Sequence, residues 1–459
     1  MSAKSAQLSS RSLLWQDGLV AAAALIFTAL VLLHGLRATS DAPTLLLPAP
    51  QGATLAALRP PPSKLQILAA QSAAFDGIGK GLEAAIAAVP EVPWGQFGLS
   101  NAEIISSKIE YDPSRDRYIQ KLADGRTAIL SLEPKIQRRI VRAMNNATEP
   151  GEAAVVIDPS TGRVLAMADD GNEEHGQGLS RRAFAWAAST FKLITAASLF
   201  EHSSITPASE SCIHGGGQSV QEELLADNRE LDTLCMSFQR AMALSANVVF
   251  ARYADRRLTP EQLTETAERF GFNSKIPFEM PVEISRFKAP SERLEFARAA
   301  AGFQHSRMSP LHGAMIEAAI ANEGRMMLPT MVESIVDAEG NIVWEHTPIE
   351  WRVVLSAAQA ERMREVQATT CTTGTARTEF LHRPGWPSSV QMWGKTGTLL
   401  NRRADGTTPS DPRMYKWFTG IARKDDQEIA VTSLVVQHPS WQISGSYLAS
   451  EAVLGMFSP

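Results

Sequence analysis

The chain has 459 residues, of which 44% are hydrophobic and 20% are charged. This balance is that of an ordinary globular protein and excludes a largely disordered or fibrous chain. The formal net charge of −5 argues against a nucleic-acid partner, because such proteins carry a strongly basic surface. Three cysteines are too few for a disulfide scaffold and lack the spacing of zinc ligands, so we expect no metal site.

A single long apolar run, residues 18–36, lies near the amino terminus. As a helix it would extend roughly 28 Å, close to the ~30 Å hydrocarbon thickness of a bilayer. Lys4 and Arg11 precede it, and positive charge on that side favours a cytoplasmic amino terminus. We therefore predict a cytoplasmic tail over 1–17 and one transmembrane anchor over 18–36. A cleaved signal peptide is the alternative, although its apolar region is usually shorter.

Either alternative places the rest of the chain outside the cytoplasm, where the cysteines can oxidise. Cys212 and Cys235 could then form a disulfide and leave Cys371 unpaired. Three buried free thiols are the alternative, which we slightly favour from the sequence.

Two segments separate the apolar run from the main body of the chain. Residues 37–62 contain six prolines and predict a stiff, extended linker. Residues 63–147 are predicted to form a small amino-terminal region, Ala-rich and helical at first and with a further helix at about 133–145. The pattern does not determine the fold of this region.

Residues 148–459 show strand patterns at both ends and helical patterns between them. Two apolar strands at 153–157 and 163–168 flank a turn that contains Pro159 and Gly162. The fold class that this order predicts is α+β, with one five-stranded antiparallel sheet built from both ends of the segment, flanked by helices and packed on an all-helical lobe. The expected helices are 189–203, 233–256, 309–323 and 445–457, and the expected late strands are 390–398, 417–423 and 429–437.

The first chemical motif is Ser189-Thr190-Phe191-Lys192, at the start of an apolar helical run. A spacing of three puts Ser189 and Lys192 on one helix face, and serine is a favoured N-cap. Burial and the positive helix end both disfavour a charged Lys192, so a neutral amine would lie beside an alcohol, as in a nucleophile with its base. Ser285 and Lys288 have the same spacing, but prolines flank them and no apolar helix follows, so we discard that pair.

The second motif is Ser245-Ala246-Asn247, which follows a helical stretch at 237–244. A serine hydroxyl both donates and accepts hydrogen bonds and can pass a proton onward. The Asn247 amide can hold a substrate amide. Taken alone, an ordinary polar helix end explains these residues better.

The third motif is Lys395-Thr396-Gly397-Thr398, at the end of an alternating strand. Gly397 lets a ligand approach the backbone closely. The lysine and the two hydroxyl groups suit a carboxylate ligand. An exposed strand end is the equally good alternative when the motif is taken alone.

Together and in this order, the three motifs resemble the set that marks penicillin-binding proteins and serine β-lactamases. We identify residues 148–459 as similar to a penicillin-binding protein transpeptidase domain of the monofunctional, membrane-anchored type. Segments around the motifs also resemble the family: 158–167, 189–197, 373–376 and 417–420.

The resemblance implies acyl transfer on D-Ala-D-Ala stem peptides of peptidoglycan, with no cofactor. Ser189 would be the nucleophile, Lys192 its general base, and Ser245 the proton donor to the leaving D-Ala. Asn247 would orient the peptide. The carboxylate would bind Lys395, Thr396 and Thr398, next to Gly397, and the backbone N–H groups of residues 189 and 398 would hold the oxyanion.

The same resemblance sets the expected location, partners and alternatives. It implies a single-pass protein of the inner (cytoplasmic) membrane with a periplasmic catalytic domain, which β-lactams would acylate. No glycosyltransferase module is recognisable, so a separate membrane glycosyltransferase is a possible partner. A D,D-carboxypeptidase or a class D-like β-lactamase could carry the same motifs. A β-lactam-sensing binding module is disfavoured, because it would need further membrane spans.

Overall fold

The computed structural model describes residues 109–147, 149–171, 178–215, 219–400, 412–437 and 443–458. They belong to one compact unit, Glu83–Pro459. The predicted tail, anchor and linker, and the first part of the predicted amino-terminal region, lie outside the described residues. Within the described ranges, no helix is both long enough and apolar enough to cross a bilayer.

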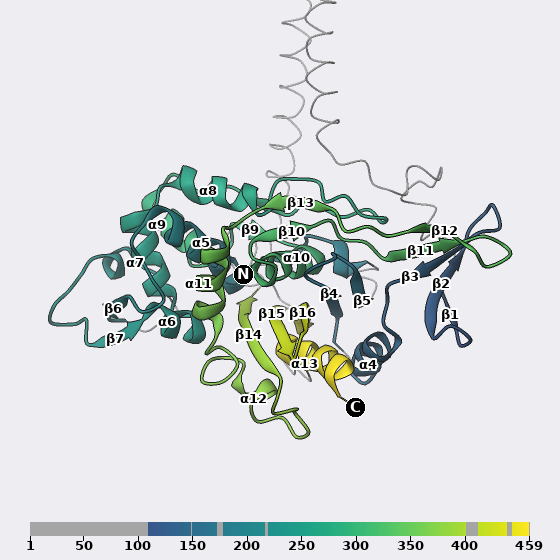
Figure 1. Cartoon of the computed structure of the whole chain (residues 1–459). Coiled ribbons are helices and arrows are strands. Elements are labelled where there is room, and N and C mark those ends of the chain that lie inside the picture. Colours follow the sequence, from purple (N-terminus) through teal and green to yellow (C-terminus); the bar gives the residue numbers. More distant parts are fainter. Residues whose placement is uncertain are drawn as a thin grey trace, which may run out of the picture. The chain divides into compact units, whose positions relative to one another are not determined.

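A five-stranded antiparallel sheet, in the order β14-β15-β16-β4-β5, is the framework of the unit (Figure 1). The early strand β4 pairs with the late strand β16, so Val156 lies opposite Val431. The predicted α+β sheet, built from both ends of the segment, is therefore confirmed. The strands are β4 (Gly151–Ile157), β5 (Val164–Gly171), β14 (Gln391–Leu400), β15 (Met414–Lys424) and β16 (Gln427–Gln437).

The turn between β4 and β5 depends on a glycine. Gly162 has φ +77°, and a Cβ at this position would lie 2.1 Å from the carbonyl oxygen of Leu328. Its N–H donates to Asp158 O at 2.9 Å, which closes the turn. Both the positive φ and the close approach exclude larger side chains here.

Alternate residues of each strand face the two sides of the sheet, as the period of two requires. On one side, Ala154 and Val156 contact α4 (Pro134–Asn145) and α13 (Gly445–Phe457) in one apolar core. On the other side, Val155 and Ile157 belong to the core formed with α10 (Pro310–Ala321) and the helical lobe. Figure 1 shows α13 and α4 next to each other over the sheet. The helices predicted at 133–145, 309–323 and 445–457 are thus confirmed.

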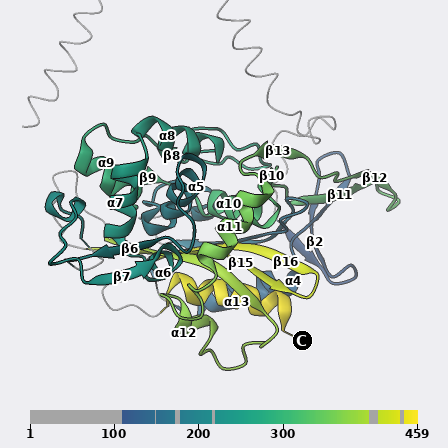
Figure 2. The same cartoon turned by 60° about the vertical axis from the view of Figure 1, so that its left-hand side comes forward.

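The helical lobe lies away from β11 and β12, as Figure 2 shows. Its core is rich in phenylalanine, with the Phe238 and Phe250 rings 4.9 Å apart between centroids. Most of its helices begin with a side-chain cap or a proline, such as the capping box of Thr259 with Gln262. The helices are α5 (Lys192–His202), α6 (Phe238–Leu244), α7 (Asn247–Arg257), α8 (Pro260–Arg269), α9 (Arg293–Ala300) and α11 (Ala357–Gln367). The short helix α12 (Arg377–Phe380) lies on the other side of the sheet, where Phe380 shares the core of α4 and α13.

The single helix predicted over 233–256 is wrong. Its first residues form β7 (Leu234–Ser237), which pairs with β6 (Glu210–Ile213), and Ser245 interrupts the remainder in a left-handed conformation with φ 57°. A disulfide joins Cys212 and Cys235, which are opposite each other in this hairpin. The preference for free thiols was therefore also wrong. Only Cys371 is a free thiol among the described residues, and it is buried.

A second sheet, in the order β1-β2-β3-β11-β12, was not predicted. It joins three strands of the predicted amino-terminal region to two strands inserted between α10 and α11. Because α4 packs on the central sheet, residues on both sides of the proposed boundary at 147/148 share one core, and that boundary stays a prediction. The remaining strands are β1 (Glu110–Asp112), β2 (Arg117–Lys121), β3 (Thr127–Leu130), β8 (Arg286–Phe287), β9 (Ser306–Arg307), β10 (Arg325–Met327), β11 (Val332–Val336), β12 (Ile342–Glu345) and β13 (Glu350–Val353).

Candidate active site

Ser189 lies in a tight 3₁₀ turn, Ala188–Phe191, that leads into α5. We predicted Ser189 as the helix N-cap, but α5 begins at Lys192 and Ser189 makes no capping bond. The turn is held instead by Ala187 O, which accepts from the Thr190 N–H at 3.2 Å and from the Thr190 hydroxyl at 2.5 Å. Ala188 has φ 52°, a strained value for a residue with a side chain. The Ser189 hydroxyl is thereby left to interact with Lys192.

The Lys192 amine is completely buried and has three polar neighbours. Its Nζ lies 2.8 Å from Ser189 Oγ, 2.7 Å from Asn247 Oδ1 and 2.5 Å from the carbonyl oxygen of Ala301. The Phe250 ring lies on another side of it, with its centroid 5.4 Å from Nζ. No carboxylate forms an ion pair with this amine in the described part of the chain.

Burial favours a neutral amine here, and these neighbours can accommodate its two N–H donors and one lone pair. The carbonyl oxygens of Asn247 and Ala301 can only accept, so they take both N–H groups. The lone pair then accepts the hydrogen bond from the Ser189 hydroxyl. Burial, and after it the charge of Lys395, holds the pKa of Lys192 well below its usual value. An uncharged base that contacts a hydroxyl can therefore remove its proton.

Ala301 and Gly302 contact Lys192 and the nucleophile turn, and neither was predicted from the sequence. Ala301 supplies its carbonyl oxygen to Lys192. Gly302 has φ +87°, and a Cβ there would lie 2.3 Å from the carbonyl oxygen of Ala188. A main-chain acceptor leaves no side-chain signature, and an isolated glycine is common in surface turns that have no connection to an active site.

Ser245 and Asn247 lie where α6 ends and α7 begins. The left-handed conformation of Ser245 turns the chain, so that Asn247 starts the next helix and reaches Lys192. Ser237 accepts a hydrogen bond from the Arg240 N–H and so caps α6, in agreement with the predicted start of this stretch.

The motif of residues 395–398 lies on β14, an edge strand of the central sheet. A Cβ at Gly397 would lie 3.2 Å from Thr190 Cγ2 and 3.3 Å from Ala187 O, so a glycine allows the strand to lie against the nucleophile turn. Lys395 is completely buried, and burial lowers its pKa to about 7. Its Nζ donates to Thr396 O at 2.8 Å.

One cavity of about 390 Å³ brings the three motifs together. Ser189, Ser245, Asn247 and residues 396–398 line it, whereas the two lysine side chains lie buried beside it. Thr375, which belongs to a segment that resembles the family but was not predicted as a site residue, has its hydroxyl 2.5 Å from that of Thr396. The further lining residues are Leu244, Thr378, Glu379, Lys416, Trp417, Ser444, Gly445 and Ser446.

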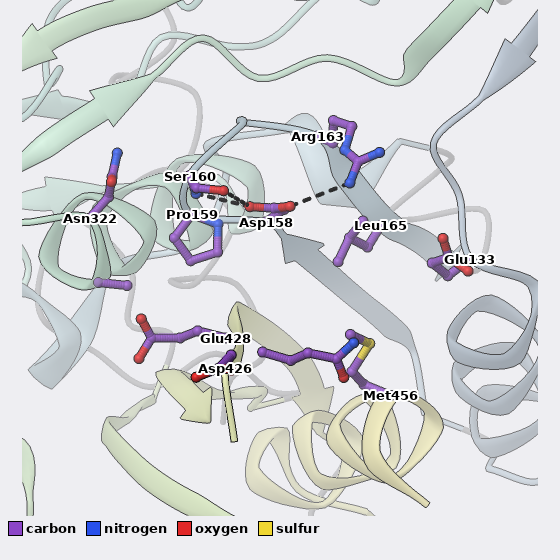
Figure 3. Close-up of a pocket in the computed structure, with 12 residues that line it drawn as sticks. Glu133, Asp158, Pro159, Ser160, Arg163, Leu165, Asn322, Asp426, Glu428 and Met456 are labelled. Carbon is purple, nitrogen blue, oxygen red and sulfur yellow. Dashed lines mark hydrogen bonds and ion pairs between the residues drawn. The ribbon is translucent and has the colours of Figure 1, made fainter. Parts of the chain in front are cut away.

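Other candidate regions lack this chemistry. Ser285, the discarded serine, is buried and accepts a hydrogen bond from the Ser309 N–H at 3.3 Å. A cavity of about 620 Å³ lies by the turn between β4 and β5 (Figure 3). There Asp158 accepts from Ser160 and forms an ion pair with Arg163. The described residues contain no group of three or more His, Cys, Asp or Glu that could hold a metal ion.

The known proteins that resemble this chain are penicillin-binding proteins or D,D-transpeptidases. The family model described as penicillin binding protein transpeptidase domain matches residues 152–454. Peptidoglycan D,D-transpeptidase PbpA of Mycolicibacterium smegmatis is 25% identical over 339 residues, covering 66% of each protein, so the match spans just under two thirds of that relative's length.

Solved structures share the fold. The D,D-transpeptidase domain of a peptidoglycan glycosyltransferase from Eggerthella lenta has a TM-score of 0.60 at 24% identity, over 73% of this chain and 84% of that one. Penicillin-binding protein A of Mycobacterium tuberculosis, solved as a ceftriaxone acyl-enzyme, has a TM-score of 0.59 at 20% identity, over 72% of this chain and 79% of that one. Since the family model covers more than half of its residues, the chain belongs to the penicillin-binding protein transpeptidase domain family.

Proposed function

We propose that the chain is a peptidoglycan D,D-transpeptidase that cross-links stem peptides through an acyl-enzyme on Ser189. The observation that carries this proposal is the completely buried Lys192 amine, whose Nζ lies 2.8 Å from the Ser189 hydroxyl and also contacts the carbonyl oxygens of Asn247 and Ala301. Family membership and the convergence of the three motifs on one cavity support it.

In the acylation step, Ser189 Oγ attacks the carbonyl carbon of the penultimate D-Ala while Lys192 accepts the hydroxyl proton. The backbone N–H groups of Ser189 and Thr398 hold the oxyanion, and one such donor typically lowers the barrier by about 2.7–4 kcal/mol. The peptide C–N bond then breaks, and Ser245 passes a proton to the departing D-Ala amine. Asn247, besides holding Lys192, orients the stem peptide.

Substrate recognition follows from residues 395–398. Lys395, Thr396 and Thr398 bind the terminal carboxylate of the donor, and Gly397 keeps β14 close to the nucleophile turn. Lys395 has its pKa lowered to about 7, so an incoming carboxylate is the partner that favours its charged form. A β-lactam would enter in place of the donor and acylate Ser189.

The same proposal covers location and partners. Residues 1–17, 18–36 and 37–62 form the cytoplasmic tail, the anchor in the inner membrane and the linker, and 63–147 and 148–459 form the small region and the periplasmic transpeptidase domain. The disulfide between Cys212 and Cys235 supports an oxidising, extracytoplasmic compartment. A separate membrane glycosyltransferase would supply the glycan strands.

Covalent labelling with fluorescent penicillin tests the proposal. We expect the wild type to be labelled, Ser189→Ala to lose all labelling, and Ser285→Ala, which removes the serine of the second S-x-x-K match, to keep it. Labelling of Ser189→Ala would refute the proposed nucleophile. The lifetime of the adduct then separates the alternatives, because a lifetime of hours favours a penicillin-binding protein and one of seconds favours a β-lactamase.

A further inference from the structure

Glu379, on the short helix α12, is the one carboxylate among the described residues that line the active-site cavity. It is half-buried, and its carboxylate has no hydrogen bond or ion pair within the part of the chain that the structure describes. Burial raises the pKa of Glu379 and the charge of Arg383 opposes that rise, but the Arg383 guanidinium donates its hydrogen bonds to Ser450 and Glu451. The cavity thus contains an acidic group for which the described residues supply no hydrogen-bond or ion-pair partner.

The negative charge of Glu379 is opposite to the charge of the two lysines at this cavity. Lys416 lines the same cavity, half-buried, and Lys395 lies buried beside it. Both suit a donor peptide that enters with its carboxylate. A negative charge nearby repels that carboxylate, at a cost of about 1 kcal/mol for each such pair even in water at 4 Å. Glu379 therefore does not serve the donor, and its chemistry fits a cation.

We propose that Glu379 binds the ammonium group of the acceptor peptide and directs the acyl-enzyme toward an amine rather than toward water. This inference rests on the proposed transpeptidase function and names the second substrate of the same cavity by its charge. Glu379 is then a specificity residue that contacts the acceptor, distinct from the three motifs that handle the donor.

The reaction balances with the groups already described. The acceptor arrives as an ammonium and releases one proton to solvent in the open cavity. The neutral amine attacks the acyl carbon, the new amide C–N bond forms, and the bond from the acyl carbon to Ser189 Oγ breaks. The second amine proton returns to Ser189 Oγ through Lys192. When water attacks instead, no cation is present and Glu379 contributes nothing.

The setting of Glu379 suits this role. Burial raises its pKa, while the charge of Arg383 opposes the rise. A carboxylate that loses hydration without gaining a partner is stabilised by an arriving ammonium. A charge-assisted hydrogen bond of this kind contributes more than one between neutral groups.

The test is the partition of one acyl-enzyme between acceptors. Full-length wild type and Glu379→Gln receive an acylated donor peptide ending in D-Ala-D-Ala, with glycylglycine as the charged acceptor or methanol as an uncharged one. We expect Glu379→Gln to lower the ratio of aminolysis to hydrolysis about tenfold or more. Methanolysis and penicillin acylation should stay within about twofold of the wild type. Glu265→Gln, on the exposed face of α8, is the matched control and should change nothing.

Each outcome decides the question. An unchanged aminolysis ratio in Glu379→Gln overturns the inference, and so does an equal loss with glycylglycine and methanol, because the residue would then only shape the cavity. Glu379→Ala must reproduce the amine-selective loss, which covers the case in which glutamine makes a new contact. Failure of wild-type Ser189 to acylate at all would refute the proposed function instead, so the two failures are distinguishable.

Discussion

Replacing Lys192 by methionine should separate the catalytic value of the buried amine from its effect on stability. Methionine is apolar, unbranched and close to lysine in length, so it fills the same space. It removes the base, and we expect acylation by penicillin to fall about 10²–10⁴-fold. The fold should survive, because Lys192 forms no ion pair in the described chain.

The effect on stability follows from the protonation of lysine in the two states. Unfolded Lys192 has its usual pKa of 10.5, whereas burial holds the pKa of the folded amine well below that value, as the proposed neutral base requires. Removing that proton at pH 7 costs about 5 kcal/mol, which Lys192→Met avoids. The variant leaves Asn247 Oδ1 and Ala301 O without a donor, at about 1–3 kcal/mol each. The two contributions nearly offset each other at pH 7, with a net effect between a loss of about 1 and a gain of about 3 kcal/mol.

The pH dependence is the sharper prediction. Because the unfolded wild type binds one more proton at Lys192 than the folded wild type, this group makes stability rise with pH up to about pH 10. The variant lacks that contribution, so its advantage over the wild type should shrink by about 1.4 kcal/mol per pH unit. Urea unfolding of both full-length proteins between pH 6 and pH 9 measures the difference. A constant difference across this range would show that Lys192 is charged in the folded protein and would refute the general-base assignment.

Two further substitutions test the support of the site. In Gly302→Ala the new Cβ would lie 2.3 Å from the Ala188 carbonyl oxygen and displace the nucleophile turn, so penicillin acylation should fall at least about tenfold. Gly340→Ala is the control for backbone strain, because Gly340 has a similar positive φ but open space around it. Equal acylation in both variants would contradict the steric argument. Replacing Cys212 and Cys235 together by serine should lower the free energy of unfolding by about 2–4 kcal/mol. It should also slow acylation, because β7 leads directly into the helix that ends at the second motif, and a stability unaffected by reducing agent in the wild type would show that the bond does not form.

Residues with a strong local pattern were predicted well. The strands from 390 onward and the helix at 445–457 match because alternation and an apolar run define each of them. The three motifs also converge on one cavity as their combined order predicts, although none of them is distinctive when taken alone. Long-range pairing is a different matter. The pairing of Thr127 with Val336 joins short strands far apart in the sequence, and no local pattern encodes that partner.

Errors near the site have a common physical cause. The 3₁₀ turn at Ser189 lies against Gly302 and its Ala187 N–H donates to Ser306 O, and the strand at Cys235 is bonded to Cys212, so both are in contact with other segments. The Ala301 carbonyl is the clearest case, because any residue type could supply the same oxygen atom. Sequence reasoning identifies side chains with distinctive chemistry, but it cannot see main-chain atoms that become specific only through folding.

The two buried lysines are hard to explain as structural residues. Lys192 and Lys395 are both completely buried, and burial lowers the pKa of each. Below the usual lysine pKa each costs folding free energy, and the charge of Lys395 makes a proton on Lys192 still less favourable. Methionine or leucine would fill the same space without that cost. The pair is therefore best understood as stability given up for chemistry: one lysine is kept neutral beside the nucleophile, and the other is poised to gain its charge when an anion binds.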